Sequence, residues 1–188
     1  MSRMVILPVG APDNVVLEAL ERRLHQVLSW EIARLTPLPL PVEAFNADQS
    51  QYEALHIMRA AAEVIPADAL RVLAVTEEDL SIPMLTFVYG QAQLSGRIAL
   101  MSLARLRQEF YGMTPQPALL ITRAMKEALH ELGHTFGLRH CPRPSCLMAL
   151  ANDIQHVDGK ENDFCGGCAL LFNDALHTIE MTAEKETR

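Results

Sequence analysis

Glycine, aromatic residues and low-complexity tracts are all scarce in this chain. Only 9 of its 188 residues are glycine and 5% are aromatic, whereas 49% are hydrophobic and 21% are charged. No run of like charges interrupts the chain, so the composition argues against disorder. A chain of this length can bury about 70% of the surface that it exposes when unfolded. We therefore expect a single domain, residues 1–188, with a sizeable core.

Long hydrophobic runs are also absent near the N-terminus. The apolar run at residues 4–7 is too short for the core of a signal peptide or for a membrane span. Its composition suits a first strand instead. We expect a cytoplasmic protein that makes no membrane contact.

A surplus of basic residues is missing as well. The chain has 16 Lys and Arg against 23 Asp and Glu, a formal net charge of -7. Binding to nucleic acid or to an anionic membrane surface requires clustered Lys and Arg that neutralise phosphates. We expect neither partner, and the sequence leaves the oligomeric state open.

Strand-like runs and helical stripes alternate along the first half of the chain. Val5–Val9 and Arg71–Thr76 are predicted strands, and apolar residues at three- and four-residue spacing predict helices within Val16–Leu28 and Tyr52–Ile65. Three prolines within Thr36–Pro41 leave any strand near that segment short, irregular or at an edge. This alternation predicts a sheet covered by helices.

The next segment predicts a hairpin followed by a long helix. Phe87–Gln93 and Arg97–Ser102 are strand-like, and the glycine-containing connection between them is typical of a hairpin. At least one antiparallel strand is therefore expected, which makes the fold class α/β (α+β) with a mixed sheet. Ala118–His134 consists of good helix formers, follows two prolines and ends near a glycine.

That helix carries two histidines and a glutamate in the pattern H-E-x-x-H. His130 and His134 are four residues apart, so on a helix they share one face and both can reach one ion. Glu131 lies beside that face. Its carboxylate can accept a proton from a water whose pKa the metal lowers.

A third histidine completes the pattern H-E-x-x-H-x-x-G-x-x-H. Gly137 can take a left-handed conformation and turn the chain, which brings His140 back as a third ligand. Three imidazoles leave a fourth position open, as in catalytic rather than structural zinc sites. Chance would produce the five fixed residues with a probability on the order of 10⁻⁵. The other histidines have no partner at ligand spacing and are interpreted as ordinary core or surface residues: His25, His56, His156 and His177.

All four cysteines follow the third histidine, at spacings C-x4-C and C-x2-C. Cys141, Cys146, Cys165 and Cys168 form two thiol pairs, which a closed tetrahedral site requires. In a reducing compartment this crowding favours metal ligands over disulfides, and we expect structural zinc. A redox dithiol formed by the last two cysteines at a helix start is the weaker alternative.

At these residues the chain resembles the metzincin clan of zinc peptidases and, more narrowly, the archaemetzincin family. The family signature continues after the third His as a Cys, four residues, a second Cys, one residue, a Met and later C-x2-C. Here these positions are matched by His140-Cys141, Cys146, Met148, Cys165 and Cys168. The motif covers residues 130–168, and the α/β pattern upstream is compatible with the family.

The resemblance implies a twisted mixed sheet with backing and active-site helices. It divides the chain into an N-terminal subdomain, residues 1–137, and a small zinc-stapled C-terminal subdomain, residues 138–188, with a final helix. It also implies a catalytic zinc held by the three histidines, Glu131 as general base and acid, and Met148 in a methionine-containing turn beneath the metal. Phe87–Gln93 would be an edge strand that borders the cleft and pairs with an extended peptide or protein substrate.

Two absences qualify the resemblance. Ala-Leu-Ala-Asn follows Met148, so the tyrosine that some metzincins carry there is missing and oxyanion stabilisation would fall mainly on the zinc. No cysteine precedes the helix of residues 118–134, which excludes latency through a thiol switch. Two other functions are weighed against an endopeptidase with two zinc ions per chain: an aminopeptidase limited to small peptides, and a zinc-ribbon-like binding module without peptidase activity.

Overall fold

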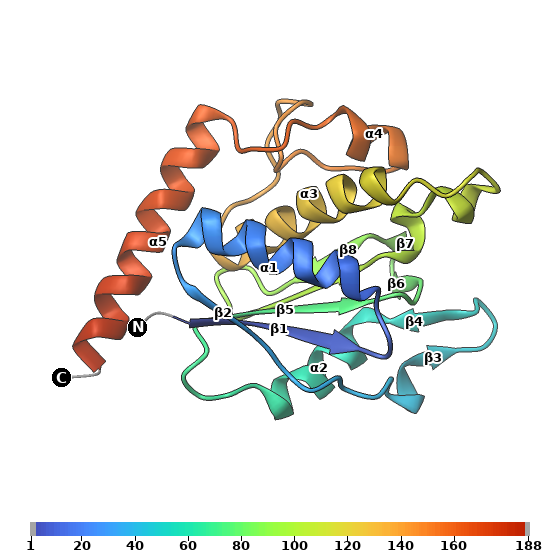
Figure 1. Ribbon diagram of the computed structural model, residues 1–188, viewed down its shortest axis with the longest axis horizontal. Helices are drawn as coiled ribbons and strands as arrows, with labels where there is room; N and C mark the ends of the chain where they lie inside the picture. The colour runs from blue at the N-terminus through green and yellow to red at the C-terminus, as the bar shows by residue number, and fades with distance from the viewer. Residues whose placement is uncertain (1–2, 187–188) are drawn as a thin grey trace.

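A five-stranded mixed sheet forms the centre of the protein in a computed structural model that describes residues 3–186 (Figure 1). The strand order is β2-β1-β5-β9-β8; the first four are parallel and β8 is antiparallel to β9. The hairpin predicted from the sequence is therefore present, with β8 at an edge. The strands are β1 (Arg3–Val9), β2 (Glu31–Arg34), β5 (Arg71–Thr76), β8 (Gly90–Ala92) and β9 (Ile98–Ser102).

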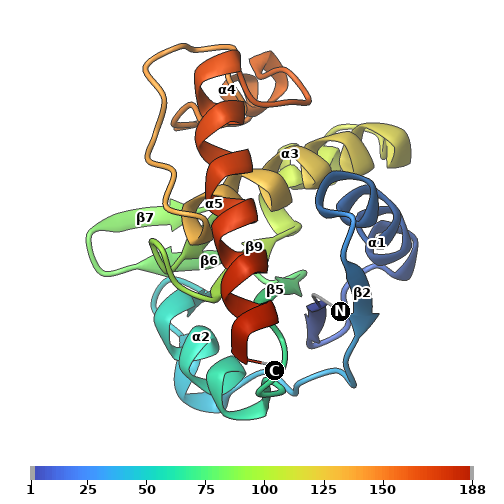
Figure 2. The same ribbon diagram turned by 90° about the vertical axis from the view of Figure 1, so that its left-hand side faces the viewer.

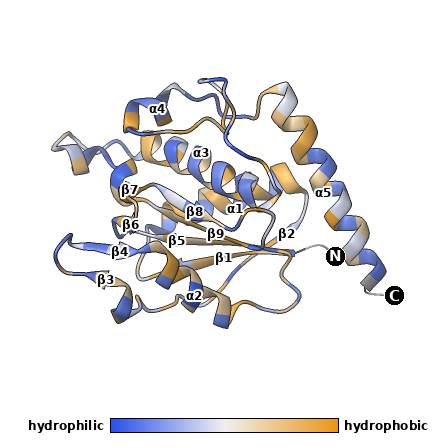
Figure 3. Cartoon of the chain, turned by 180° about the vertical axis from the view of Figure 1, so that it is seen from behind, coloured by the Kyte–Doolittle hydropathy of each residue, from blue (hydrophilic) through white to orange (hydrophobic). Residues whose placement is uncertain are grey.

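The central strands are buried on both faces because helices cover the sheet on both sides. Every residue of β5 and β9 is buried, and their sequences are nearly continuous apolar runs, as expected of parallel strands in such a position. Figure 3 shows β1, β5 and β9 as a mostly hydrophobic layer between more polar helix surfaces.

Helices α1 (Asn14–Leu28) and α3 (Pro117–Thr135) pack on one face of the sheet, and α2 (Ala54–Val64) packs on the other (Figure 1). Asp13 caps α1, since its side chain accepts a hydrogen bond from the Val15 amide. The stripe predicted for α1 faces the sheet. The stripe predicted for α2 (Leu55, Met58, Ala62 and Ile65) is wrong by about one residue, because the buried face consists of Ala54, Ile57, Met58 and Ala61, whereas Leu55 and Ala62 are exposed. Two apolar cores result, one on each face.

A second, four-stranded sheet was not predicted from the sequence. Its strand order is β3-β4-β6-β7, and none of its strands exceeds four residues. The strand expected at residues 87–93 is divided between the two sheets, because Phe87 and Val88 belong to β7, which pairs with β6, whereas β8 pairs with β9. The strands of the second sheet are β3 (Phe45–Asn46), β4 (Gln51–Glu53), β6 (Leu80–Ile82) and β7 (Leu85–Val88). Three short 3₁₀ helices lie outside the sheets: η1 (Val42–Ala44), η2 (Ala104–Leu106) and η3 (Gln108–Tyr111).

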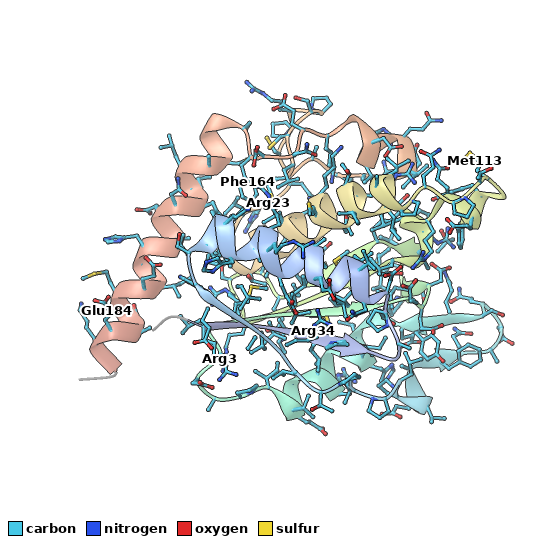
Figure 4. All side chains as sticks on the ribbon, in the orientation of Figure 1. Arg3, Arg23, Arg34, Met113, Phe164 and Glu184 are labelled. Atoms are coloured by element: carbon cyan, nitrogen blue, oxygen red, sulfur yellow. The ribbon has the colours of Figure 1, made fainter. Side chains whose placement is uncertain are left out.

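The C-terminal segment contains α4 (Ile154–Gly159) and α5 (Gly166–Glu186), and α5 crosses in front of the sheet in Figure 2. Figure 4 shows Phe164 close to Arg23 of α1, where Arg23 forms an ion pair with Asp163. Buried residues of this segment belong to the same core as α1 and α3. The subdomain boundary at residue 137 stays a prediction. Within residues 3–186, no helix is long and apolar enough to cross a membrane.

Candidate active site

Three histidines converge at the C-terminal end of α3. The Nε2 atoms of His130 and His134, one helical turn apart, lie 3.3 Å from each other. Gly137 has a φ of 89°, in the left-handed region that the sequence predicted for this turn. The chain then returns so that the His140 ring lies 5.3 Å from that of His130, and the ligand atoms of all three residues are within 4.8 Å of one another.

Backbone carbonyl groups orient two of the rings. The Nδ1 atom of His130 lies 2.9 Å from the Leu147 oxygen, and that of His134 lies 2.7 Å from the Leu138 oxygen. When Nδ1–H donates to these carbonyls, Nε2 is unprotonated and directed toward the other rings. Burial also lowers the pKa of all three histidines, which keeps them neutral. Neutral imidazoles with anchored Nδ1 atoms are the donors that zinc prefers, so this set fits the metal.

Glu131 lies beside the histidines in a cleft of about 950 Å³. Burial, and then the nearby charge of Glu127, raise the pKa of Glu131 well above its usual value. Gly90 of β8 lies directly against this glutamate, since a Cβ atom at Gly90 would be 2.5 Å from the Glu131 Cγ. Only a glycine lets the edge strand approach the glutamate so closely.

Two charged residues of the site were missed by the sequence analysis. Glu127 is fully buried one helical turn before Glu131, and the two carboxyl groups hydrogen-bond each other. Lys160 is 4% exposed, and its Nζ lies 3.4 Å from the His130 Nδ1. The spacing of Glu127 and Glu131 on one helix face was a usable signal. Lys160 lies in a polar loop sequence, which contains no signal that this residue is buried in the site.

A set of interactions holds the segment before Lys160 against α3. Arg123 is 2% exposed and donates two hydrogen bonds to the Asp158 carboxylate, at 2.7 and 2.6 Å. Lys126 donates to the carbonyl oxygens of Val157 and Asp158. These contacts place the ammonium group of Lys160 among the two glutamates and His130.

Met148 is fully buried beneath the helical turn that carries His130 and His134. A Cβ atom on Gly133 would lie 2.5 Å from the Met148 Sδ, so the methionine packs directly against the backbone of that turn. The role of Met148 in a methionine-containing turn stays a prediction, which this contact supports.

The four cysteines form a second cluster behind this turn. The sulfur atoms of Cys141, Cys146, Cys165 and Cys168 lie within 4.8 Å of one another. The Cys168 backbone amide donates to the Cys165 sulfur and lowers its pKa to about 7, whereas burial raises the pKa of Cys146 and Cys168. Four sulfur donors around one point suit a tetrahedral zinc ion.

Among residues 3–186, only these two groups of His, Cys, Asp or Glu converge closely enough to hold a metal. The remaining histidines lie elsewhere. The Nδ1 atom of His25 contacts the Trp30 carbonyl, His56 lies beside Glu53 and His156 lies beside Asp153. His177 is exposed on α5.

Comparison with known proteins decides the family. The chain matches the model of Peptidase family M54 over residues 42–174, well over half of its length. The chain belongs to this family. It is 39% identical over 173 residues to the archaemetzincin of Methanocaldococcus jannaschii, covering 92% of this chain and 93% of that protein. It is 38% identical over 180 residues to the archaemetzincin of Pyrococcus furiosus, covering 92% and 93%.

Solved archaemetzincin structures share the fold. The crystal structure from Archaeoglobus fulgidus superposes with a TM-score of 0.79 at 31% identity, covering 90% of this chain and 99% of that one. The structure from Methanopyrus kandleri gives 0.78 at 33% identity, covering 93% and 96%. As a member of this family, and similar over most of its length to archaemetzincins, the protein is a zinc metallopeptidase that acts on peptide or protein substrates.

Proposed function

We propose that His130, His134 and His140 hold the catalytic zinc and that Glu131 is the general base and acid of peptide-bond hydrolysis. A zinc ion held there would supply a Lewis acid that acidifies water and polarises the substrate carbonyl. The observation that carries this proposal is the convergence of three neutral imidazoles, two of them anchored by backbone carbonyls, beside a buried carboxylate in one cleft.

The role of Glu131 follows from its place on the cleft wall. Its carboxylate accepts a proton from the attacking water and returns it to the nitrogen of the leaving amine. Contact with Gly90 limits where the side chain can move, and the Lys160 ammonium group opposes protonation of the carboxylate. The glutamate is therefore held in one place, and its pKa, which burial and Glu127 raise on balance, suits a group that must both take up and release a proton.

A second zinc ion bound by Cys141, Cys146, Cys165 and Cys168 would be structural. Four protein sulfurs complete a tetrahedron and leave no position for substrate. None of these cysteines lines the cleft. The clustering of all four sulfurs supports a metal site over a redox dithiol made by Cys165 and Cys168 alone.

The charges of the cleft support an endopeptidase over an aminopeptidase limited to small peptides. An aminopeptidase needs a free carboxylate to bind the ammonium group at the substrate N-terminus. Among the described residues, the carboxylates that line the cleft are Glu127 and Glu131, which hydrogen-bond each other. Glu131 is assigned to the reaction itself, and Glu127 is only 4% exposed.

Metal analysis and peptide cleavage test the proposal together. Elemental analysis of fully loaded protein is expected to give two zinc ions per chain, and a single ion would count against it. A mixed peptide library with blocked N-termini should be cut as well as one with free N-termini, and chelation should abolish cleavage in both. Cleavage confined to free N-termini would favour the aminopeptidase. A salt-dependent shift with DNA or RNA and no hydrolysis would favour the zinc-ribbon-like module.

A further inference from the structure

Among the described residues, four charged side chains line the cleft besides the histidines, and they differ in how far a substrate can reach them. Glu127, Glu131 and Lys160 are only 4 to 5% exposed. The fourth, Arg139, is exposed. A peptide that enters the cleft therefore meets one accessible fixed charge, the guanidinium group of Arg139.

Arg139 has hydrogen-bond donors to spare. Within residues 3–186, its guanidinium group makes no hydrogen bond, no ion pair and no contact with an aromatic ring. Two other arginines show the contrast, because Arg105 donates two hydrogen bonds to Asp79 and Arg107 donates two to Glu77. The N–H groups of Arg139 are therefore available to a bound molecule.

The turn that carries Arg139 fixes its position along the cleft. A Cβ atom on Gly137 would lie 3.0 Å from the Ser95 Oγ, and the Ser95 amide donates to the His134 carbonyl at 2.9 Å. Leu94, directly before Ser95, also lines the cleft. Arg139 consequently lies toward the Leu94 end of the cleft, next to the third of the proposed metal ligands.

This position decides which part of a substrate Arg139 meets. Because Gly90 lies against Glu131, the reacting centre is level with Gly90, and β8 runs from there toward Leu94. Antiparallel pairing is about two- to three-fold commoner than parallel pairing. A peptide antiparallel to β8 has the residues that precede the cleaved bond at the Leu94 end. An extended peptide advances about 3.3 Å per residue, so Arg139 faces roughly the first three of them.

A guanidinium group at this place selects for a carboxylate. Its planar set of N–H donors bonds both oxygens of a carboxylate at once, and such charge-assisted bonds are about twice as strong as bonds to a neutral amide. The whole chain has a net charge of -7, which does not attract acidic peptides from a distance. Salt screens exposed charges beyond about 8 Å, so the attraction is confined to the surroundings of Arg139.

We propose that Arg139 is a specificity-determining residue that binds an acidic side chain of the substrate. The acidic residue lies within about three residues on the N-terminal side of the cleaved bond. This inference rests on the proposed catalytic centre, which fixes where the cleaved bond lies. A carboxylate at the C-terminus of a short peptide has the same chemistry, but in this arrangement it belongs to the other end of the cleft.

A series of hydroxamate probes tests the inference by binding rather than by turnover. Each probe is an acetylated tripeptide hydroxamate in which aspartate replaces one of three alanines, and its matched probe has asparagine at the same position. Calorimetry on zinc-loaded protein compares them with acetohydroxamate, which contacts the metal alone. At one of the three positions the aspartate probe should bind about three- to tenfold more tightly than the asparagine probe, and added salt should reduce this ratio.

Three variants localise the effect. Arg139→Gln should abolish the preference for aspartate, and Arg139→Glu should reverse it through repulsion of like charges. Arg143→Glu is the matched control, because Arg143 is also an exposed arginine with no side-chain partner among the described residues but does not line the cleft. It changes the net charge as much as Arg139→Glu does and should keep the preference. Acetohydroxamate is measured with every variant, which separates a change at the metal from a change at the side chain.

A further pair of probes distinguishes the two sources of a carboxylate. N-hydroxysuccinamoyl-Leu-Ala extends from the metal on the C-terminal side and is compared as the free acid and as the amide. The ratio of the two affinities should be the same in Arg139→Gln as in the wild type. A preference for the free acid that disappears in Arg139→Gln would overturn the proposal in favour of a site for the substrate C-terminus.

The remaining outcomes separate this inference from the proposed function. Equal affinity of the aspartate and asparagine probes at all three positions would overturn the role of Arg139 while leaving the metal site intact. A preference that persists in Arg139→Gln, or one that Arg143→Glu also abolishes, would do the same. Failure of acetohydroxamate to bind the zinc-loaded protein would overturn the proposed catalytic centre and the inference with it.

Discussion

The histidine cluster and the cysteine cluster share the segment His140–Met148 and differ in how they meet solvent. The histidine cluster has three donors that range from His130, which is 4% exposed, to the exposed His140, and it faces the cleft. The cysteine cluster has four donors and none of them lines the cleft. A site with an open position suits catalysis, and a closed site suits structural support.

The two clusters share one short segment of backbone. Cys146 and Met148 flank Leu147, whose carbonyl orients the His130 ring. The Cys141 amide donates to the Met148 carbonyl at 2.9 Å. Metal binding by the cysteines would therefore hold in place the backbone segment, residues 146–148, that orients the His130 ring.

Loss of the cysteine site is expected to have the largest effect. Cys165→Ala should release the structural zinc and lower the free energy of unfolding by more than about 4 kcal/mol, because loss of a metal is among the most destabilising single changes. It should also weaken retention of the histidine-bound zinc through the Leu147 carbonyl. Melting temperature and zinc content would be measured together.

Ser145→Ala is the control for this variant, since Ser145 adjoins Cys146 but donates only an exposed hydrogen bond to Glu161. Its melting temperature and zinc content should match the wild type. If Cys165→Ala keeps full zinc at the histidines and an unchanged melting temperature, the two sites are independent and the cysteines serve another purpose.

Loss of the base should affect chemistry alone. Glu131→Gln preserves volume but cannot accept a proton, so turnover should fall by roughly 10²- to 10⁴-fold. Zinc content should stay at the wild-type value, which separates this variant from Cys165→Ala. The measurement is kcat on a cleaved library peptide alongside elemental analysis. Unchanged turnover would contradict the assignment of Glu131.

Approach of the edge strand to the glutamate can be tested at Gly90. In Gly90→Ala the new methyl group would meet the Glu131 side chain at 2.5 to 2.7 Å, so the carboxylate must move. A misplaced base is expected to lower kcat by about 10- to 100-fold, while zinc content stays unchanged. Gly159→Ala is the control, because a Cβ atom there meets nothing within 4 Å. Equal kcat values in the two variants would mean that the contact does not position Glu131.

The ligand pattern could be predicted from the sequence because each motif is local. His130 and His134 share a helix face by their spacing alone, and the α3 helix around them follows from its own residues. Other parts of the site depend on contacts between distant segments. Strands of two to four residues, such as β7 and β8, contain too little alternation to be recognised, and the division at Tyr89 depends on which sheet each half joins.

The buried charges show the same limit. Lys160 lies in a sequence that is typical of an exposed loop, and it is buried only because Arg123 and Lys126 hold the preceding residues against α3. From the sequence, Gly90 is only a glycine that weakens a strand. Its contact with Glu131 forms only when the sheet and α3 pack together. These features require the tertiary structure.

The smallest expected effect concerns the contact between Gly133, in the helical turn that carries His130 and His134, and Met148, which follows Cys146 by two residues. A methyl group in Gly133→Ala would lie 2.5 Å from the Met148 Sδ and 3.5 Å from the Phe164 ring. Methionine is flexible, but Met148 is fully buried, so overpacking should cost about 1–3 kcal/mol in the free energy of unfolding. A double-mutant cycle with Met148→Ala isolates the contact, because truncating Met148 provides room for the new methyl group. Gly133→Ala should then cost less in the Met148→Ala background than in the wild type. An equal cost in both backgrounds would mean that the turn beneath the histidines does not support α3 through this contact.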